Sequence, residues 1–559
     1  MTTYVFQVRL GVDSNRDGIV DFEDNGRANW VYGDEQQGAV LLVNNDRDIS
    51  DAEPTPGQYS EWSELVVEPT KVNNFPEGIS LVLRAKESSA QRFSVYMKDD
   101  SGEFQHILGK NLKDTSSPAL IVSPPLPTNG VSCYVEAHEF PGADFEGLIN
   151  IELLLLDNGV PMATDKVIYR VAPWIMTPNT LPPIKVYACE ILQEGANPNQ
   201  EFLSDLRSAL DDLKIPLEII PESENLGDRW IQDEIEFGYI QGATHTIPVV
   251  FDSPRDQGLD GFPEAKLLGP DFGHFQIGGS TPNSLDSFGN LEVSPPVTVK
   301  GRHYPFGRIV FGGRKTGDYS ENSRQMMPEL RRFFYAQKVQ SPFEIYTDWL
   351  IVGHADEIMC FVPAANNKGF QVLVASPERA HMILNRLADE GYGDTVMFEG
   401  MKRGTPDSSE SAEIKIAELL ADKEFWEANH TYQSYMNQNN RILRQELDID
   451  DRHIIQIPVL FGLPNRENRT SAYFPDMINH LVLGKTSLVP KPKGPIINGK
   501  CAFEKAFEEA LPRRNVRFIE NWYSYHQNLG EVHCGTNTRR KPFPNKRWWN
   551  YKPDGGYDI

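Results

Sequence analysis

The chain has 559 residues, which is too long for one hydrophobic core, because single cores stop growing at about 250 to 300 residues. Apolar residues make up 40% and charged residues 24%, a composition that fits folded domains and excludes a largely disordered chain. With 79 acidic against 54 basic residues the formal net charge is -25, which argues against nucleic acid and anionic membranes as partners and favours cations or basic substrates. Solubility alone also explains such an excess.

The amino-terminal residues lack a basic stretch followed by an apolar one, and no later stretch reaches ~18 uninterrupted apolar residues. We therefore expect a cytoplasmic protein. The cysteines are odd in number and show no CxxC spacing, so we expect reduced thiols rather than a disulfide framework or a thiolate zinc site. They are Cys133, Cys189, Cys360, Cys501 and Cys534.

Residues 1–172 contain short runs in which apolar and polar residues often alternate, with turn residues between them and no convincing helix. Seven or eight strands at this spacing predict an antiparallel β-sandwich of immunoglobulin-like architecture, although the Cys…Trp…Cys signature of antibody domains is missing. The expected strands lie at residues 4–10, 38–44, 80–85, 92–97, 118–123, 131–138, 148–156 and 167–171.

A proline-rich segment at residues 173–183 breaks this pattern and predicts a stiff linker, so we place the domain boundary after residue 172. In residues 173–559, short strands alternate with helical patterns, which predicts a mixed α/β domain. Residues 200–214 carry leucine and phenylalanine at helical spacing. Residues 413–447 form the longest helical stretch, interrupted near residues 421–422.

The first specific motif occupies residues 13–24 and matches the beginning of a calcium-binding loop, with oxygen-bearing side chains at alternate positions and Gly18 at the sharp turn. A preceding strand, and Asp24 in place of a glutamate at the twelfth position, exclude an EF-hand. An acidic hairpin turn is the alternative interpretation. The candidate ligands are Asp13, Asn15, Asp17, Asp21 and Asp24, together with Asp46 after the next strand.

The second motif is Trp230-Ile-Gln232-Asp233-Glu234-Ile-Glu236. As an extended segment it would place Gln232, Glu234 and Glu236 on one face, suited to hard cations, and Asp233 on the other. A charged surface strand is the alternative.

Two further motifs carry groups that perform acid–base and nucleophilic chemistry. His354 and Asp356 would share a face of a strand as an acid/base pair, although such a pair is more often structural. Cys534 precedes Gly-Thr-Asn and three basic residues, so nearby positive charge would lower its pKa from ~8.5 and make it a nucleophile. An inert buried thiol is the alternative for Cys534, and the interpretation we give the other four cysteines.

Taken in order, Trp-x-Gln-Asp-Glu, His-x-Asp and His533-Cys534-Gly-Thr-Asn resemble the peptidyl-arginine deiminases. The resemblance runs from the linker to residues 546–550 and extends more loosely into the 13–24 loop. It implies an immunoglobulin-like domain followed by a five-bladed α/β propeller (the pentein fold) built from ββαβ modules. In the family two carboxylates grip the guanidinium, a cysteine attacks it and a histidine transfers protons. These roles map onto Asp233, Asp356, Cys534 and His354.

The resemblance therefore implies an enzyme that hydrolyses peptidyl arginine to peptidyl citrulline and ammonia through a covalent thiouronium on Cys534. Arg255 and Trp230 are the implied contacts to the peptide. Arginine-containing proteins or peptides would be the substrates, and dimers occur in the family.

The resemblance also implies several calcium ions as cofactors. The first expected set comprises Gln232, Glu236 and Glu292 with the backbone carbonyls of Phe288 and Leu291. The second comprises Glu234, Asp252, Ser253 and Asp256. Asp271 and the 13–24 loop would form further sites that bridge the domains. All are oxygen donors, as calcium requires.

Some features depart from the vertebrate members. We expect a shorter form without their first N-terminal domain and without a basic nuclear-import run. Gln257 and Asn528 stand where some members have arginine, which changes the expected recognition of the substrate backbone. A deiminase of free arginine or agmatine, and a catalytically silent calcium-binding scaffold, remain alternatives.

Overall fold

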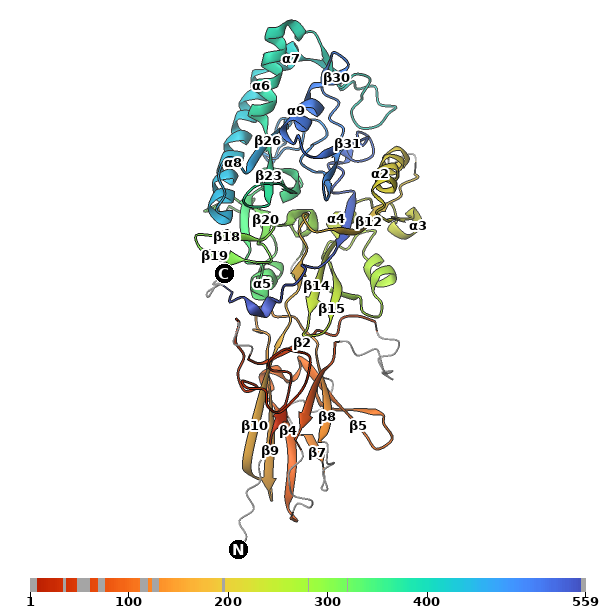
Figure 1. Ribbon diagram of the computed structural model, residues 1–559. Helices are drawn as coiled ribbons and strands as arrows, with labels where there is room; N and C mark the ends of the chain where they lie inside the picture. Colours follow the sequence, from red (N-terminus) through yellow and green to blue (C-terminus); the bar gives the residue numbers. More distant parts are fainter. Residues whose placement is uncertain are drawn as a thin grey trace.

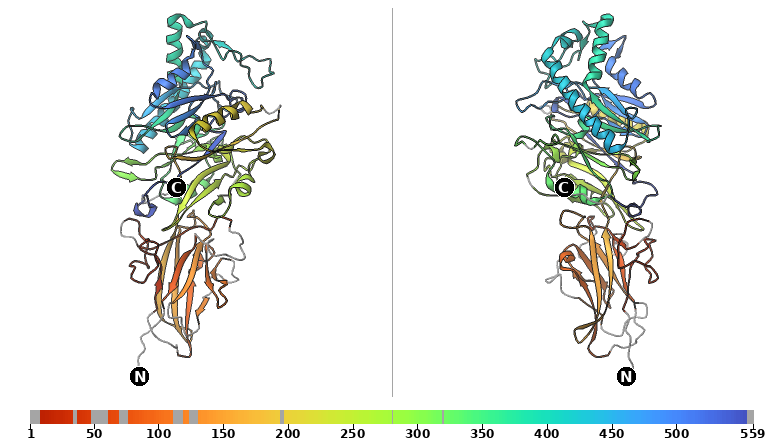
Figure 2. Two further views of the ribbon diagram at one scale, coloured as in Figure 1. Left: turned by 45° about the vertical axis from the view of Figure 1, so that its right-hand side comes forward. Right: turned by 90° about the vertical axis from the view of Figure 1, so that its left-hand side faces the viewer.

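The computed structural model describes residues 8–33, 37–47, 61–68, 76–110, 119–122, 130–193, 197–279, 281–318 and 320–553. It contains an all-β region and a mixed α/β region, which lie end to end in all three views (Figures 1 and 2). None of the helices in the described ranges is both long enough and apolar enough to span a membrane.

The all-β region consists of two five-stranded sheets. The first contains, in spatial order, β1 (Leu10–Gly11), β3 (Ser63–Val67), β8 (Val131–Ala137), β5 (Phe93–Lys98) and β6 (Phe104–Gly109). The second contains β2 (Ala39–Leu41), β10 (Val160–Val171), β9 (Leu148–Asp157), β4 (Ile79–Ala85) and β7 (Ala119–Val122). Strands β2 and β10 pair in parallel, and the other described pairs are antiparallel. The predicted all-β character is confirmed; the expected strand residues 4–7, 118 and 123 lie outside the described ranges.

Alternation along the strands explains why these two sheets pack together. In β9, Ile149, Ile151 and Leu153 are fully buried on one face, as a period of two residues requires. They belong to the same hydrophobic cluster as Val95 and Val135 of the other sheet. The only helix in the described part of this region is the single turn α1 (Glu87–Ala90).

The α/β region contains five sheets that share one pattern, in which a central strand pairs antiparallel with one neighbour and parallel with another. The first sheet contains β11 (Ile175–Met176), β14 (Ile235–Gln241), β15 (Thr246–Asp252) and β16 (Gly273–Gln276). The second contains β17 (Leu291–Val293), β20 (Ile309–Gly313) and β21 (Phe343–Tyr346), and the third contains β22 (Met359–Pro363), β23 (Phe370–Ser376) and β26 (Ile454–Pro458). The fourth contains β27 (Leu481–Leu483), β28 (Thr486–Pro490) and β31 (Asn515–Ile519). The fifth joins β13 (Leu217–Ile220) and β12 (Pro183–Cys189) to β32 (Thr536–Arg540) near the other end of the chain.

Helices connect the parallel strands of these sheets, which makes each unit a ββαβ module. The connecting helices are α2 (Gln200–Leu213), η2 (Pro263–Leu267), α5 (Pro328–Gln337), the group α6 (Pro377–Leu387), η6 (Ala388–Tyr392), α7 (Ile416–Ala421) and α8 (Lys423–Leu447), and α9 (Ala502–Ala510). Within the ranges given above, no strand ladder joins one of the five sheets to another, so the modules do not form one closed sheet. Three small hairpins complete the region: β18 (Val297–Val299) with β19 (Arg302–Tyr304), β24 (Val396–Met397) with β25 (Ile414–Lys415), and β29 (Ile496–Ile497) with β30 (Lys500–Cys501).

The two helical patterns predicted from the sequence are confirmed. Helix α2 buries Phe202, Leu206 and Leu210 on one face. The long stretch is interrupted at Asp422, whose side chain accepts a hydrogen bond from the Phe425 amide at 3.0 Å and caps α8. The mixed α/β character of the second region therefore agrees with its sequence.

Candidate active site

Four residues from three separate segments of the chain lie close together. Asp233 lies on the helical turn α4 (Ile231–Glu234), His354 and Asp356 lie at the 3-10 turn η5 (Ala355–Glu357), and Cys534 lies just before β32. The Cys534 Sγ is 3.4 Å from Asp356 Oδ2, and His354 Nδ1 is 3.4 Å from Asp233 Oδ1. Asp233, His354 and Cys534 line a cavity of about 400 Å³.

The local structure of two motifs differs from the sequence prediction. Residues 231–234 are helical rather than extended, because the amides of Asp233 and Glu234 both donate to the Trp230 carbonyl. Residues 355–357 are a 3-10 turn rather than a strand, held by Glu357 Oε1, which accepts from the Gly353 and His354 amides at 2.8 Å. In both motifs a tight turn, and not the alternation of a strand, determines the direction in which each side chain points.

Three buried polar atoms around the sulfur have no hydrogen-bond partner: Asp233 Oδ1, Asp356 Oδ1 and His354 Nδ1. The other imidazole nitrogen, Nε2, lies 2.7 Å from the Ser284 carbonyl oxygen, to which it must donate. His354 Nδ1 therefore bears a free lone pair when the ring is neutral. All three unpartnered atoms are then acceptors, and buried acceptors without donors are rare in folded proteins.

The Cys534 thiol differs from the expectation of a lowered pKa. Burial raises its pKa well above the ordinary value, and the carboxyl groups of Asp356 and Asp233 raise it further. The basic residues after it point elsewhere: Arg539 stacks on Phe272, and Arg540 lines a different cavity. Burial likewise raises the pKa of Asp233. These surroundings favour the thiol form of Cys534 over the thiolate.

The expected peptide contacts lie at the same cavity, which Trp230, Arg255, Gln257 and Asn528 line. Arg255 is already paired there. Its guanidinium contacts Asp228 at 2.6 Å and Glu234 at 2.9 Å, and its side chain is 8% exposed.

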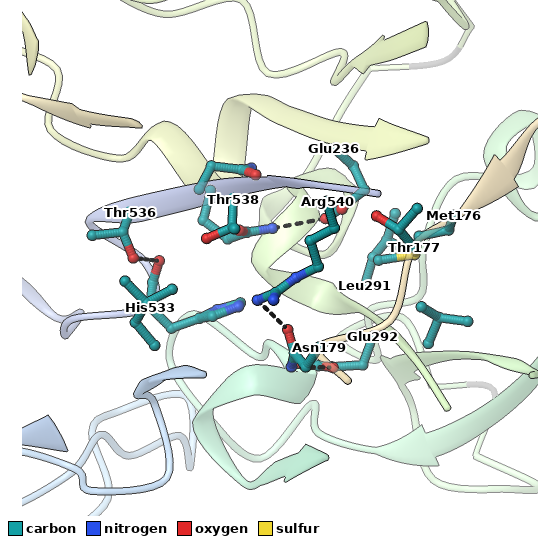
Figure 3. A pocket seen from close by; sticks show the side chains of 14 residues that line it. Met176, Thr177, Asn179, Glu236, Leu291, Glu292, His533, Thr536, Thr538 and Arg540 are labelled. Carbon is teal, nitrogen blue, oxygen red and sulfur yellow. Dashed lines mark hydrogen bonds between the residues drawn. The ribbon is translucent and has the colours of Figure 1, made fainter. Parts of the chain in front are cut away.

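The first expected calcium set surrounds a separate cavity of about 20 Å³, which has room for about one water-sized guest (Figure 3). Gln232, Glu236, Leu291 and Glu292 line it, and Gln232 Nε2 donates to Glu236 Oε2 at 2.9 Å and to the Phe288 carbonyl at 3.3 Å. Glu292 Oε1 is buried without a partner. Burial raises the pKa of Glu236 to about 7 and that of Glu292 to about 8. Buried oxygens of this kind fit a hard cation.

The residues of the second expected calcium set contact one another only in part. Gln276 Nε2 donates to Asp252 Oδ2 at 3.4 Å and to Asp256 Oδ1 at 3.2 Å, which links these two carboxylates. Glu234 Oε2 accepts a hydrogen bond from Arg255. Glu234 Oε1 and Asp252 Oδ1 are buried without hydrogen-bond partners. The Ser253 amide donates to the Glu234 carbonyl at 2.8 Å. The donor chemistry fits calcium in this set too.

The expected ligands near the all-β region form two groups. In the 13–24 loop, Asp13 accepts from the amides of Asp17 and Gly18 at 3.0 Å, and Asn15 Nδ2 donates to Asp24 Oδ1 at 2.7 Å. Across the two regions, the Asp271 amide donates to Asp46 Oδ2 at 3.0 Å. Over the whole described part of the chain, no three His, Cys, Asp or Glu side chains are grouped closely enough to hold a metal ion.

Comparison with known proteins places the chain in a family. Residues 161–550 match the family model of protein-arginine deiminase, and residues 6–157 match that of its middle domain. The chain belongs to the protein-arginine deiminase family. It is 40% identical over 98% of its length to human protein-arginine deiminase type-1, covering 82% of that protein, and 41% identical over 94% of its length to human type-4, covering 79%. The solved agmatine deiminase of Enterococcus faecalis is 11% identical, with 66% of this chain and 96% of that chain covered and a TM-score of 0.36.

Several residues at this candidate site were given no role from the sequence. The His533 imidazole Nδ1 lies 2.9 Å from Asp356 Oδ2, and its ring points toward the cavity of Figure 3. Gly289 lies so close that an added Cβ would be 2.4 Å from His354 Nδ1 and 2.7 Å from Asp233 Oδ1. Asn479 contacts Cys534 directly. The position of His533 next to Cys534 could have indicated that it lies at the site. No feature of the sequence indicated this for Gly289 or Asn479.

Proposed function

We propose that this chain hydrolyses peptidyl arginine to peptidyl citrulline and ammonia, with Cys534 as the nucleophile. The observation that carries the proposal is the set of unpartnered acceptors around the sulfur. A guanidinium is a planar fork of donors with no acceptor, so it supplies what Asp233 and Asp356 lack.

Binding would come first. With Asp233 and Asp356 each accepting hydrogen bonds from the guanidinium nitrogens, the central carbon would face the Cys534 sulfur, which lies 3.4 Å from Asp356. The bound cation also favours the thiolate, because it offsets the two carboxylates that raise the Cys534 pKa.

The chemistry then follows in two stages. The thiolate attacks the guanidinium carbon and forms an S–C bond, while the C=N π electrons move onto nitrogen. His354 Nδ1 takes up the proton that Cys534 loses when the thiolate forms and delivers it to one nitrogen, which leaves as ammonia and generates the thiouronium. In the second stage His354 Nδ1 accepts a proton from water, the resulting hydroxide adds to the carbon, and the thiolate leaves. His354 returns its proton to the thiolate, and the proton left on the product oxygen passes to ammonia. Substrate plus water thereby become citrulline plus ammonium.

The proposal includes calcium as a cofactor. Gln232, Glu236, Glu292, Phe288 O and Leu291 O would hold one ion, and Glu234, Asp252, Ser253 and Asp256 a second; Asp271, Asp46 and the 13–24 loop would serve others. When bound, calcium supplies positive charge that compensates buried carboxylates. Because Gln232 and Glu234 flank Asp233 on one helical turn, holding them also holds Asp233 toward the cavity.

The surroundings of the cavity favour peptidyl over free arginine. A free amino acid would require a cation for its α-carboxylate. Arg255 is the only cation among the described residues that line the cavity, and it is bound by Asp228 and Glu234. A peptide, whose carboxyl group is an amide, has no such requirement.

We also propose an immunoglobulin-like sandwich over residues 1–172 and a five-bladed propeller over residues 173–559. The five ββαβ modules, and the pairing of β12 with β32, support the second part. Arginine-containing proteins or peptides as substrates, a cytoplasmic location and a homodimer complete the proposal.

The deciding experiment measures citrulline formed from a blocked peptidyl arginine and from free arginine during a calcium titration, with Cys534→Ala as control. We expect calcium-dependent product from the peptide and none from the variant. Preferential turnover of free arginine would establish the alternative substrate, and no turnover of either would favour a silent scaffold.

A further inference from the structure

Asn479 is linked to the nucleophile more closely than any residue already assigned a role. It precedes β27 and lies 55 residues before Cys534. Its side-chain oxygen accepts from the Cys534 amide at 3.1 Å, and its Nδ2 lies 3.1 Å from the Cys534 sulfur. The Asn479 carbonyl accepts from the His533 amide at 3.2 Å. One buried residue therefore holds both the backbone and the side chain of Cys534.

The contact with the backbone fixes which way the amide faces. The Cys534 amide is a donor, so the Asn479 atom opposite it must be the oxygen. The NH2 group then necessarily faces the sulfur. A second contact agrees with this orientation, because the same Nδ2 is 3.4 Å from the Asp356 carbonyl oxygen. Asn479 thus presents a donor to the sulfur.

That donor stands out among the groups around Cys534. Asp233 from α4 and Asp356 from η5 both interact unfavourably with a thiolate. His354 is turned to Ser284 and Asp233, and His533 to Asp356. Asn479 Nδ2 is a side-chain donor 3.1 Å from the sulfur, and a donor in that position stabilises a thiolate against the carboxylates, as the backbone of Glu531 also does.

A buried polar network holds Asn479 in place. Asp476 Oδ1 accepts from the Ile478 amide at 2.8 Å, and the Asn479 amide donates to the Asp476 carbonyl at 3.2 Å. The Asp476 amide donates to Glu531, which also lies 2.8 Å from His526 Nδ1. Since residues 526–531 lead into the turn that carries Cys534, the same network holds both Asn479 and Cys534 in position.

We propose that Asn479 is a positioning residue of the deimination reaction, which holds Cys534 in place and stabilises its thiolate by a hydrogen bond. The inference rests on the proposed function. Asn479 exchanges no proton and forms no covalent bond. Its N–H group donates to the sulfur lone pair before attack, and again when the S–C electrons return to sulfur and the thiolate leaves.

The test substitutes Asn479→Asp, which keeps the size and the acceptor for the Cys534 amide but places an acceptor against the sulfur. Asn429→Asp is the matched control. Asn429 is also buried, and its side chain forms hydrogen bonds with backbone groups of Phe425 and Phe461, away from the Cys534 sulfur. The readout is the rate of Cys534 alkylation by iodoacetamide as a function of pH, followed on the Cys534 peptide by mass spectrometry, with kcat and KM measured in parallel.

In Asn479→Asp we expect the apparent thiol pKa to rise by about one unit, so alkylation at neutral pH slows about 10-fold. We also expect kcat to fall about 100-fold, as for other lost stabilising donors, while KM changes little. Asn429→Asp should leave the alkylation profile unchanged. Asn479→Ser, which retains a small donor, should lie between the wild type and Asn479→Asp, and it decides the matter if Asn479→Asp does not fold.

An alkylation profile unchanged in a folded Asn479→Asp variant would overturn the inference, as would the same shift in Asn429→Asp. The alkylation assay requires no turnover. A shifted profile in a chain that forms no citrulline would therefore refute the proposed function and leave the role of Asn479 in thiolate stabilisation standing.

Discussion

At the residue scale, the chemistry of Cys534 depends on what fills the cavity. Two carboxyl groups face its sulfur, and burial removes the water that would stabilise a thiolate. A cysteine alone in this environment is a poor nucleophile, since the thiolate is the reactive form. A bound guanidinium would reverse the local charge balance.

We therefore predict that a non-hydrolysable guanidinium ligand lowers the Cys534 pKa. The pKa is raised in the free protein, so the thiolate forms only as pH rises above the ordinary range for cysteine; the ligand should move that transition to lower pH by about one unit or more. Thiolate ultraviolet absorbance, taken as the difference between wild type and Cys534→Ser, measures it. An identical transition with and without ligand would contradict the prediction.

Gly289 leads to a second prediction at this scale. An added methyl group would overlap His354 Nδ1 and Asp233 Oδ1, so Gly289→Ala should displace both groups. Misplacement of catalytic groups by about 1 Å costs about 100-fold in rate, and we expect a loss of that size in kcat/KM. Gly278→Ala is the control, because nothing lies within 4 Å of its added Cβ. Equal activities of the two folded variants would exclude a steric role for Gly289.

At the element scale, the helical turn α4 determines the directions of three consecutive polar side chains, Gln232, Asp233 and Glu234. Gln232 of α4 contacts Glu236, which lies in the following strand β14, at 2.9 Å. Glu234 instead contacts Arg255, and Asp233 faces His354. One helical turn therefore carries a residue of the candidate active site between residues of both expected calcium sets.

Because of this arrangement, we predict near-zero turnover in EGTA and recovery with excess calcium. Glu292→Gln should raise the calcium concentration for half-maximal activity about 10-fold or more, since it removes a charged ligand. Glu136→Gln provides the control, as Glu136 is also buried but lies in the all-β region. Full activity in EGTA would refute the coupling between calcium and Asp233.

At the scale of the whole molecule, aromatic contacts join the two regions. Trp30 of the all-β region stacks on Trp548 near the end of the chain, with ring centroids 5.5 Å apart and an interplanar angle of 11°. The indole of Trp548 donates to the Gln241 carbonyl at 2.8 Å, and the guanidinium of Arg170 lies 4.7 Å from the Trp30 ring. The carboxyl-terminal segment therefore ties both regions together.

Trp548→Ala should destabilise this junction by about 3 to 5 kcal/mol, the usual loss for a buried tryptophan. We expect the two regions to unfold in separate calorimetric transitions, with the all-β transition at lower temperature than in the wild type. Trp62→Ala serves as the control because Trp62 stacks on Tyr96 within the all-β region. A single unchanged transition in Trp548→Ala would show that the contact contributes little.

The sequence by itself determined the elements with strong local signals. Leucine spacing predicted α2, Asp422 marked the start of α8, and alternation predicted strands such as β9, because these patterns depend on neighbours within a few residues. The motifs around Asp233, His354 and Cys534 also identified the family. The local conformation around Asp233 and His354 was predicted wrongly, since acidic residues in a row look alike in a strand and in a tight turn.

Only the tertiary structure decided how these groups act on one another. Asn479 and Asp356 reach Cys534 from 55 and 178 residues away, and Gly289 closes on His354 from another module. Burial raises the pKa of Cys534, and the carboxyl groups of Asp356 and Asp233 raise it further, whereas the charged residues that follow Cys534 in the sequence are basic. The groups that lie close to a residue in space determine its pKa, and a local sequence pattern does not show which groups these are.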